Sequence, residues 1–175
     1  MRLNASSGHW IQTESSQINL PSVFVCKTRE ETFALGEGFA SLLKPGSIVA
    51  LKGMLGAGKT CFAKGVALRL GVNENVTSPT YTIMSEYDAF FQGVPITLYH
   101  IDAYRLNGSD DFSAIGGEEI LYSQNISLIE WSERIENMIP PDSFVVDIRI
   151  DSFGARIIEI SQKTKQNDVQ KASDL

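Results

Sequence analysis

Eight consecutive residues in the first half of the chain carry the strongest chemical signal. They read Gly53-Met54-Leu55-Gly56-Ala57-Gly58-Lys59-Thr60 and satisfy G-x-x-x-x-G-K-[ST] at every fixed position. The glycines let backbone N–H groups turn inward toward phosphate oxygens, and a following helix adds its N-terminal dipole. Lys59 can reach the β- and γ-phosphates, and the Thr60 hydroxyl can bind Mg²⁺. The pattern predicts a nucleotide-binding loop, in which we expect Lys59 to be solvated until phosphate arrives.

Two acidic residues stand where a metal and a water molecule would be needed. Asp102 follows the run 96–101, and Glu130 follows the apolar run 126–129. On parallel strands both carboxylates would lie at the carboxyl edge of the sheet, where such folds bind ligands. Carboxylates at this place hold Mg²⁺ and water beside the γ-phosphate. We therefore expect both to act in the site, the alternative for each being a charged residue in an ordinary loop.

Three further features carry weaker signals. The turn Thr77-Ser78-Pro79-Thr80 could contact the γ-phosphate as a switch segment does, or could simply lead into a strand. Cys61 opens the helix after the loop and is expected to pack. His9 and His100 have no partners at metal or triad spacing, so we expect no functional role for either.

Helix and strand signals alternate around these residues. One helix is expected from a capping box at 28–31 to Pro45-Gly46, and another from the loop to about Leu70. The remaining signals indicate strands over 48–51, 80–87, 95–102 and 127–131, a short helix over 133–138, and a hairpin over 144–160 that turns at 151–154. These elements predict an α/β fold: a three-layer P-loop NTPase-like domain with a mixed sheet and a C-terminal antiparallel hairpin.

Composition sets limits on the function. The chain has 175 residues, of which 43% are apolar, and its net charge of −6 lacks the electrostatic footprint of a stand-alone nucleic-acid binder. It shows no membrane-length apolar run, no secretory signal and no C-x-x-C spacing. We expect a reduced cytoplasmic protein without membrane contact. Its organisation is predicted as a loosely ordered extension over 1–20, a P-loop ATPase domain over 21–162 and a disordered polar tail over 163–175.

Five segments together resemble the TsaE family, the small bacterial ATPases of tRNA threonylcarbamoyladenosine synthesis. They are LKGMLGAGKT (51–60), VTSPTYTIMSEY (76–87), YHIDAYRL (99–106), IGGEEIL (115–121) and ISLIEWSERI (126–135). They stand in the family's order and cover roughly residues 23–160. The phosphate loop alone is generic, whereas the combination of G-A-G-K-T, S-P-T-Y, D-x-Y-R-L and I-E-W is highly specific.

The resemblance implies a role for each matching residue. Lys59, Asp102 and Glu130 would be catalytic, and Thr60 would hold Mg²⁺ with the two carboxylates. The nucleotide would be bound by Gly53, Leu55, Gly56, Ala57, Gly58, Lys59, Thr60, Cys61, Thr28, Arg29 and Arg156. The threonine usual after Lys-Thr is Cys61 here, which removes a hydroxyl near the α-phosphate.

The family resemblance implies an accessory ATPase rather than a free-standing modifying enzyme. It would bind and hydrolyse ATP with Mg²⁺, weakly when alone, and act with TsaD, which transfers the threonylcarbamoyl group, and with TsaB. The product would be N6-threonylcarbamoyladenosine at position 37 of tRNAs reading ANN codons, and tRNA would be contacted indirectly, through the complex.

Three alternatives stay open from the residues alone. A small-molecule P-loop kinase would need a lid carrying arginines, and the seven arginines of this chain do not cluster in the sequence. A GTPase switch would need N-K-x-D, which is absent, and the one well-formed D-x-x-G, at 151–154, falls in the predicted hairpin turn. The third alternative is a scaffold that keeps the loop without binding nucleotide.

Overall fold

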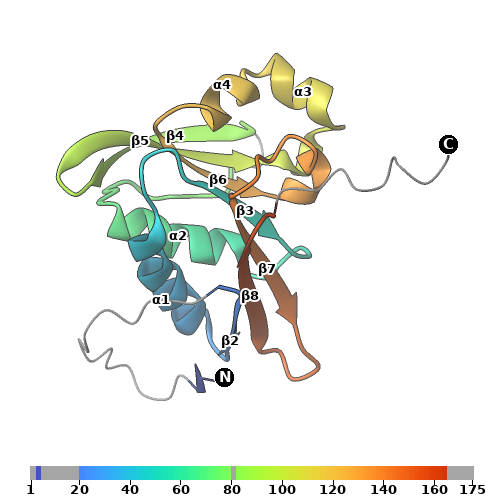
Figure 1. The fold of residues 1–175 in the computed structure, drawn as a ribbon. Helices are drawn as coiled ribbons and strands as arrows, with labels where there is room; N and C mark the ends of the chain where they lie inside the picture. Colours follow the sequence, from blue (N-terminus) through green and yellow to red (C-terminus); the bar gives the residue numbers. More distant parts are fainter. Residues whose placement is uncertain (1–2, 5–19, 80–81, 165–175) are drawn as a thin grey trace, which may run out of the picture.

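A mixed sheet runs through the part of the chain that the structure, a computed structural model, describes: residues 3–4, 20–79 and 82–164. Within these ranges eight strands follow the order β1-β2-β8-β7-β3-β6-β5-β4 (Figure 1). The strands are β1 (Leu3–Asn4), β2 (Ser22–Cys26), β3 (Ile48–Lys52), β4 (Met84–Phe91), β5 (Val94–Asp102), β6 (Ile126–Glu130), β7 (Phe144–Ile150) and β8 (Arg156–Gln162). Most of the expected extension over 1–20 and tail over 163–175 lies outside the described residues.

The centre of the sheet is parallel and its flanks are antiparallel. β3 lies between β6 and β7 and is parallel to both, and β5 is parallel to β6. The β4–β5 and β7–β8 pairs are antiparallel hairpins, and β2 is antiparallel to β8. The predicted mixed sheet and C-terminal hairpin are therefore confirmed. The carboxyl ends of β3, β5 and β6 meet at one edge of the sheet.

Helices cover the two faces of this sheet in separate layers. One hydrophobic cluster joins the sheet to α1 (Arg29–Phe39) and α2 (Lys59–Arg69). The other cluster lies under α3 (Ser109–Ala114), α4 (Gly117–Leu121) and the 3₁₀ turn η3 (Ser132–Ile135). Figure 1 shows α1 beside α2, and α3 beside α4 at the top of the view. The three-layer α/β architecture is confirmed. No helix in the described ranges is long and apolar enough to span a bilayer.

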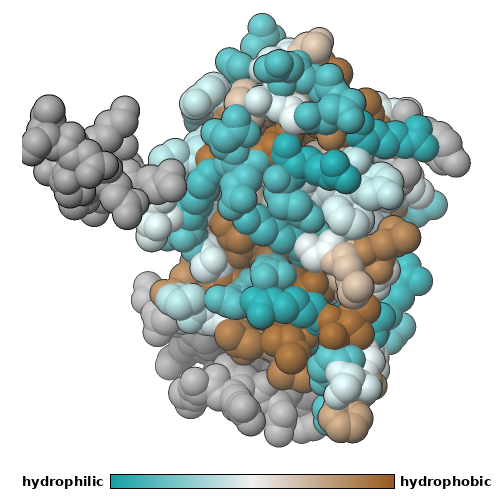
Figure 2. Space-filling model, turned by 90° about the vertical axis from the view of Figure 1, so that its right-hand side faces the viewer, coloured by the Kyte–Doolittle hydropathy of each residue, from teal (hydrophilic) through white to brown (hydrophobic). Residues whose placement is uncertain are grey.

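The second cluster reaches β7 through Val145 and contains no residue of β2 or β8. On the outer face of these two strands Val25 pairs with Ile157, and both side chains are exposed, as is Val23. Figure 2 shows brown, apolar residues in the lower half of one side of the molecule. The sheet is thus covered on both faces at its centre, and the described residues cover it on one face only at the β2–β8 end.

Several element boundaries differ from their predictions. The first helix is capped by Thr28 as expected, since the Glu31 N–H donates to Thr28 Oγ1, but it ends at Phe39 and continues as the 3₁₀ turn η1 (Ala40–Leu42). The strand expected from residue 80 begins at Met84. In place of the short helix expected over 133–138, the 3₁₀ turn η3 spans Ser132–Ile135 and is followed by a turn. No sequence pattern indicated β2, α3 or α4. These are short elements whose existence depends on neighbours distant in the sequence.

Two glycines bring the backbones of α1 and α2 into direct contact. A Cβ added at Gly36 would lie 2.2 Å from the carbonyl oxygen of Phe62, and one added at Gly65 would lie 2.0 Å from that of Phe33. Both distances are far shorter than a van der Waals contact. Since α2 begins at Lys59, this close approach fixes where the end of the phosphate loop lies relative to α1.

We expect Gly36→Ala to lower the free energy of unfolding by about 2 kcal/mol, because the added methyl group overpacks a contact between two backbones. Gly38→Ala is the matched control on the same helix, since a Cβ there meets nothing within 4 Å. That variant should gain about 0.5 kcal/mol from helix propensity. Urea unfolding of both variants measures the difference. Equal changes in the free energy of unfolding for the two variants would show that the contact between α1 and α2 leaves room for a side chain at Gly36.

Candidate functional site

The phosphate loop joins the end of β3 to the start of α2. Gly53, Gly56 and Gly58 have φ of 134°, 78° and 116°, values that residues with a Cβ rarely adopt. A Cβ at Gly53 would also lie 2.3 Å from the carbonyl oxygen of Ile148 on β7. The glycines of the motif are thus required by the backbone itself. The loop delivers Lys59 and Thr60 to the first turn of a helix, as the pattern predicts.

Lys59 is held by its own loop and by an aromatic ring. Its Nζ donates to the carbonyl oxygens of Gly53 at 2.7 Å and Met54 at 3.1 Å, and it lies 3.9 Å from the centre of the Trp131 ring. The residue is only 4% exposed, so the expectation that Lys59 is solvated is wrong. Burial lowers the pKa of the Lys59 ammonium, while the negative charges of Glu130, Glu133 and Asp102 oppose that shift. The Lys59 ammonium thus already has two hydrogen bonds and an aromatic ring as partners.

The Glu130 carboxylate is buried at the end of β6, and each of its oxygens has a partner. Oε2 accepts a hydrogen bond from Thr60 Oγ1 at 3.0 Å, and Oε1 lies 2.9 Å from His100 Nε2. The hydroxyl predicted to bind metal and the carboxylate predicted to help it are thus in direct contact. The hydrogen bond between Thr60 and Glu130 therefore joins the end of the phosphate loop to the central strands of the sheet.

The Asp102 carboxylate lies beside Glu130, because the two residues are register partners at the ends of β5 and β6. Its Oδ2 accepts from Ser78 Oγ at 2.8 Å, and its Oδ1 accepts from the Tyr104 N–H at 3.1 Å. The predicted meeting of the two carboxylates at the carboxyl edge of the sheet is confirmed. Ser78 connects the predicted turn 77–80 to this acid; residues 80 and 81 lie outside the described residues.

No cluster of three His, Cys, Asp or Glu side chains that could hold a metal ion occurs within 3–4, 20–79 and 82–164. Mg²⁺ is commonly bound by only one or two carboxylates together with phosphate oxygens and water. Thr60, Asp102 and Glu130 provide that smaller set of oxygens around one pocket. The residues present therefore fit a magnesium ion that arrives with a nucleotide.

A pocket of about 620 Å³ opens over these residues. Ten of the predicted site residues line it: Arg29, Leu55, Gly56, Gly58, Lys59, Thr60, Cys61, Asp102, Glu130 and Arg156. Thr28, Gly53 and Ala57 do not line it: Thr28 caps α1, and Gly53 and Ala57 belong to the phosphate loop. Four lining residues were not among the predicted site residues: Thr32, Ser78, Tyr104 and Trp131. Ser78 belongs to the turn 77–80, for which a switch segment and a plain turn were both left open. The pocket size suits a small-molecule ligand.

Trp131 occupies its position through an unusual backbone conformation. Its φ and ψ are 57° and 36°, in the left-handed region that bulky residues avoid. The ring packs on Tyr104, with centroids 4.9 Å apart, and lies under the Lys59 ammonium. The sequence signal for Trp131 was its place directly after Glu130. The conformation itself has no signal in a single sequence.

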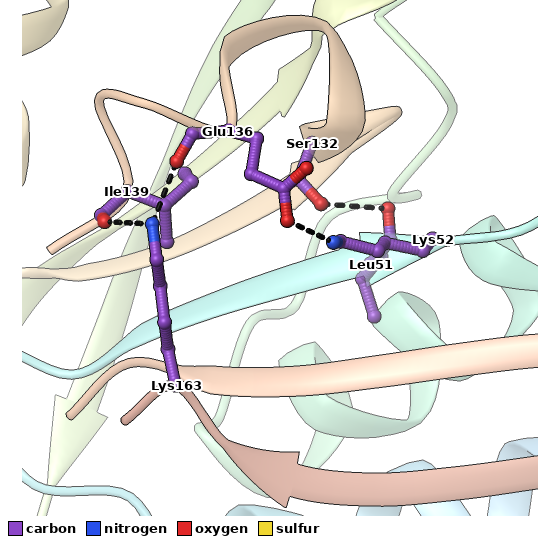
Figure 3. A network of polar contacts seen from close by, with 6 residues as sticks. All are labelled: Leu51, Lys52, Ser132, Glu136, Ile139 and Lys163. Atoms are coloured by element: carbon purple, nitrogen blue, oxygen red, sulfur yellow. Dashed lines mark hydrogen bonds and ion pairs between the residues drawn. The ribbon is translucent and has the colours of Figure 1, made fainter. Parts of the chain in front are cut away.

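Polar contacts tie the segment after Trp131 to the strand that enters the phosphate loop (Figure 3). Ser132 Oγ lies 3.4 Å from the Leu51 carbonyl oxygen, and Lys52 Nζ forms an ion pair with Glu136 Oε1 at 2.8 Å. The hydrogen bond and charge of Lys52 lower the pKa of Glu136. Lys163 Nζ donates to the Glu136 and Ile139 carbonyl oxygens at 2.6 Å each. Lys163, the first residue of the predicted polar tail, is thus bound to the folded domain.

Two cysteines lie near the side of the pocket to which α1 contributes Arg29 and Thr32 and β8 contributes Arg156. Cys61 Sγ lies 3.2 Å from the Arg29 carbonyl oxygen, and Cys26 pairs in register with Arg156. Burial raises the pKa of the Cys26 thiol to about 11. Arg29 and Arg156 therefore lie with Cys61 and Cys26, which places two positive charges on this side of the pocket.

Comparison with known proteins gives the family. A family model described as "Threonylcarbamoyl adenosine biosynthesis protein TsaE" matches residues 26–159. The chain belongs to the TsaE family. The resemblance drawn from its five sequence segments is thereby confirmed.

Individual members of the TsaE family agree with this assignment. The chain is 39% identical over 137 residues to the tRNA threonylcarbamoyladenosine biosynthesis protein TsaE of Treponema pallidum, covering 78% of this chain and 98% of that protein. It is 41% identical over 120 residues to the protein of the same name from Bacillus subtilis, covering 69% and 72%. The crystal structure of YdiB of Bacillus subtilis is similar with a TM-score of 0.65 and 32% identity, covering 80% of this chain and 84% of YdiB.

We expect iodoacetamide at pH 8 to modify Cys61 long before Cys26. A pKa of about 11 leaves about one Cys26 thiol in a thousand ionised at that pH, and only the thiolate reacts. The Cys26 rate should rise about tenfold for each pH unit until the pKa is reached. Added ADP should protect Cys61, which lines the pocket. Peptide mass spectrometry measures both rates, with Cys61→Ser as the control. Faster labelling of Cys26 would contradict its burial.

Proposed function

We propose that this chain is a Mg²⁺-dependent ATPase that serves tRNA threonylcarbamoyladenosine biosynthesis. The family and the names of its relatives support the role in tRNA modification. The observation that carries the ATPase proposal is the contact between Thr60, at the end of the phosphate loop, and Glu130, at the end of β6. It joins a loop able to bind phosphate to a carboxylate able to serve the metal. The proposed ATPase domain, residues 21–162, contains every residue of the pocket.

The proposed reaction transfers the γ-phosphoryl group of ATP to water. A bond forms between the water oxygen and the γ-phosphorus, the bond from that phosphorus to the β–γ bridging oxygen breaks, and ADP and phosphate leave. Lys59 moves from the Gly53 and Met54 carbonyls to the β- and γ-phosphates. Thr60, Asp102 and Glu130 hold Mg²⁺, which neutralises negative charge on the phosphates when bound. Gly53 to Gly58 surround the phosphates with backbone N–H groups, and Leu55, Ala57 and Cys61 complete that wall.

The two arginines complete the binding of ATP in this proposal. Arg29 and Arg156 line the pocket near Cys61, and Thr28 caps the helix that presents Arg29. They would face the nucleoside side of the ligand.

The D-x-x-G at 151–154 is a turn in which Asp151 Oδ1 accepts from the Phe153 and Ala155 N–H groups, so it is no phosphate switch.

We further propose that ATP hydrolysis depends on TsaD and TsaB, and that tRNA is reached only through their complex. Among the described pocket residues, Lys59 is the cation beside the carboxylates, because Arg29 and Arg156 lie with the cysteines. Phosphoryl transfer often needs a second positive charge at the γ-phosphate. Met54 and Leu55 are highly exposed on the phosphate loop and are available for contact with a partner. The net charge of −6 suits a protein that leaves tRNA contact to others.

We expect Lys59→Met to weaken ATP binding at least tenfold, because a charge-assisted contact to phosphate is lost while most of the packing on Trp131 is kept. Glu130→Gln should instead lower the hydrolysis rate about a hundredfold and change Mg²⁺-free ATP affinity less than threefold, since its interactions strengthen in the transition state. Isothermal titration and phosphate release measure the two effects. Lys52→Met, which removes a lysine from the loop entrance but not from the pocket, is the control. Unchanged ATP affinity in Lys59→Met would contradict the phosphate-loop assignment.

We expect the isolated chain to hydrolyse ATP slowly and the rate to rise at least tenfold when TsaD and TsaB are added together. The partner surface would then supply the second positive charge at the γ-phosphate. Steady-state phosphate release at fixed MgATP, with the partner complex titrated in the presence and absence of tRNA, measures this. A rate that is fast without partners and unchanged by them would favour an independent ATPase or the small-molecule kinase alternative.

A further inference from the structure

His100 lies against the buried Glu130 carboxylate and outside the set of residues that line the pocket. It is on β5 two residues before Asp102, its side chain is 0% exposed, and it is not among the residues that line the pocket. Its Nε2 lies 2.9 Å from Glu130 Oε1, and its Nδ1 has no hydrogen-bond partner among the described residues. A polar side chain this deeply buried needs a reason to be there.

The contacts of the two ring nitrogens assign one tautomer to His100. Nε2 faces a carboxylate oxygen, which accepts hydrogen bonds, so Nε2 carries a proton and donates it. If Nδ1 carried a proton, it would be a buried hydrogen-bond donor without a partner. That state costs more free energy than an unprotonated Nδ1, which is only an acceptor without a partner. His100 is therefore assigned the tautomer with the proton on Nε2.

We propose that His100 is a positioning residue that orients Glu130, and through it Thr60, for metal binding. The inference rests on the proposed function. The Nε2–H of His100 donates to Glu130 Oε1, which leaves Oε2 aimed at Thr60. Thr60 Oγ1 donates its only proton to that oxygen, so the lone pairs of the hydroxyl stay free for Mg²⁺. The chain of two hydrogen bonds sets which atoms of Thr60 face the pocket.

Loss of the histidine donor would leave Oε1 of a buried carboxylate without a partner. An unsatisfied buried charge is strongly unfavourable, so Glu130 would turn to find another donor and release Thr60. Partners that orient metal ligands in this way typically account for 10- to 100-fold in metal affinity or activity. The same chain of bonds leaves Lys59 and the loop glycines untouched, so affinity for nucleotide without metal should not depend on it.

The test compares His100→Gln with His100→Leu in the full-length chain. Glutamine can place an amide N–H near the position of Nε2, while leucine fills similar space without a donor. ATP affinity is measured by titration calorimetry in EDTA and again as Mg²⁺ is added, and thermal melting checks the fold. We expect His100→Leu to need 10- to 100-fold more Mg²⁺ for the same ATP affinity, and His100→Gln to stay within about threefold of the parent. Both should bind ATP in EDTA as the parent does.

Each outcome of this comparison has a definite meaning. Equal Mg²⁺ requirements in His100→Leu and the parent would overturn the positioning role and leave the ATPase proposal standing. Equal losses in the glutamine and leucine variants would show that the ring only fills space, which also overturns it. A parent chain that binds no ATP would overturn the proposed function itself, and the inference with it.

A measurement on the unaltered chain covers the case in which the variants do not fold. ¹⁵N-labelled histidine gives separate signals for ring nitrogens with and without a proton. We expect His100 to show a proton on Nε2 and none on Nδ1 in the metal-free protein, before any nucleotide is added. A proton on Nδ1 with a bare Nε2 would remove the donor to Glu130 and overturn the proposal.

Discussion

The Glu130 carboxylate is a charge buried where the phosphate loop, the central strands and the pocket meet. Removal of such a charge from water is costly, and the cost is offset only when each oxygen has a hydrogen-bond donor. Thr60 supplies one donor from α2 and His100 supplies the other from β5. The register of β5 on β6 then places Asp102 directly beside it. The geometry of the pocket follows from the need to satisfy this one group.

The polar groups of the pocket are hydrogen-bonded to one another. Lys59 donates to loop carbonyls, Thr60 to Glu130, and Ser78 to Asp102. Such a network keeps the site ordered in the absence of ligand, because no buried charge has to find water. In the proposed function, MgATP would therefore meet groups that already have hydrogen-bond partners.

The phosphate loop could be predicted because its shape is a local property, set by glycines whose backbone angles exclude other residues. The positions of Asp102 and Glu130 could be predicted because the ends of parallel strands meet at one edge. The burial of Lys59 could not, because the ring that covers it comes from Trp131, seventy-two residues further along and in a left-handed conformation. His100 carried no signal for the same reason: its partner lies on another strand. Short elements such as β2 owe their existence to pairing with β8, which a single sequence does not reveal.

The backbone contact at Gly36 and Gly65 has a mechanical consequence for the pocket. α1 and α2 are in backbone contact at these two glycines, and the first residue of each, Arg29 and Lys59, lines the pocket. This close packing fixes the starts of the two helices relative to each other, and with them one wall of the pocket. The pocket residues Ser78, Tyr104 and Trp131 belong instead to loops and to the short 3₁₀ turn η2 (Ala103–Arg105). The pocket is thus built from one wall of packed helices and one wall of short segments.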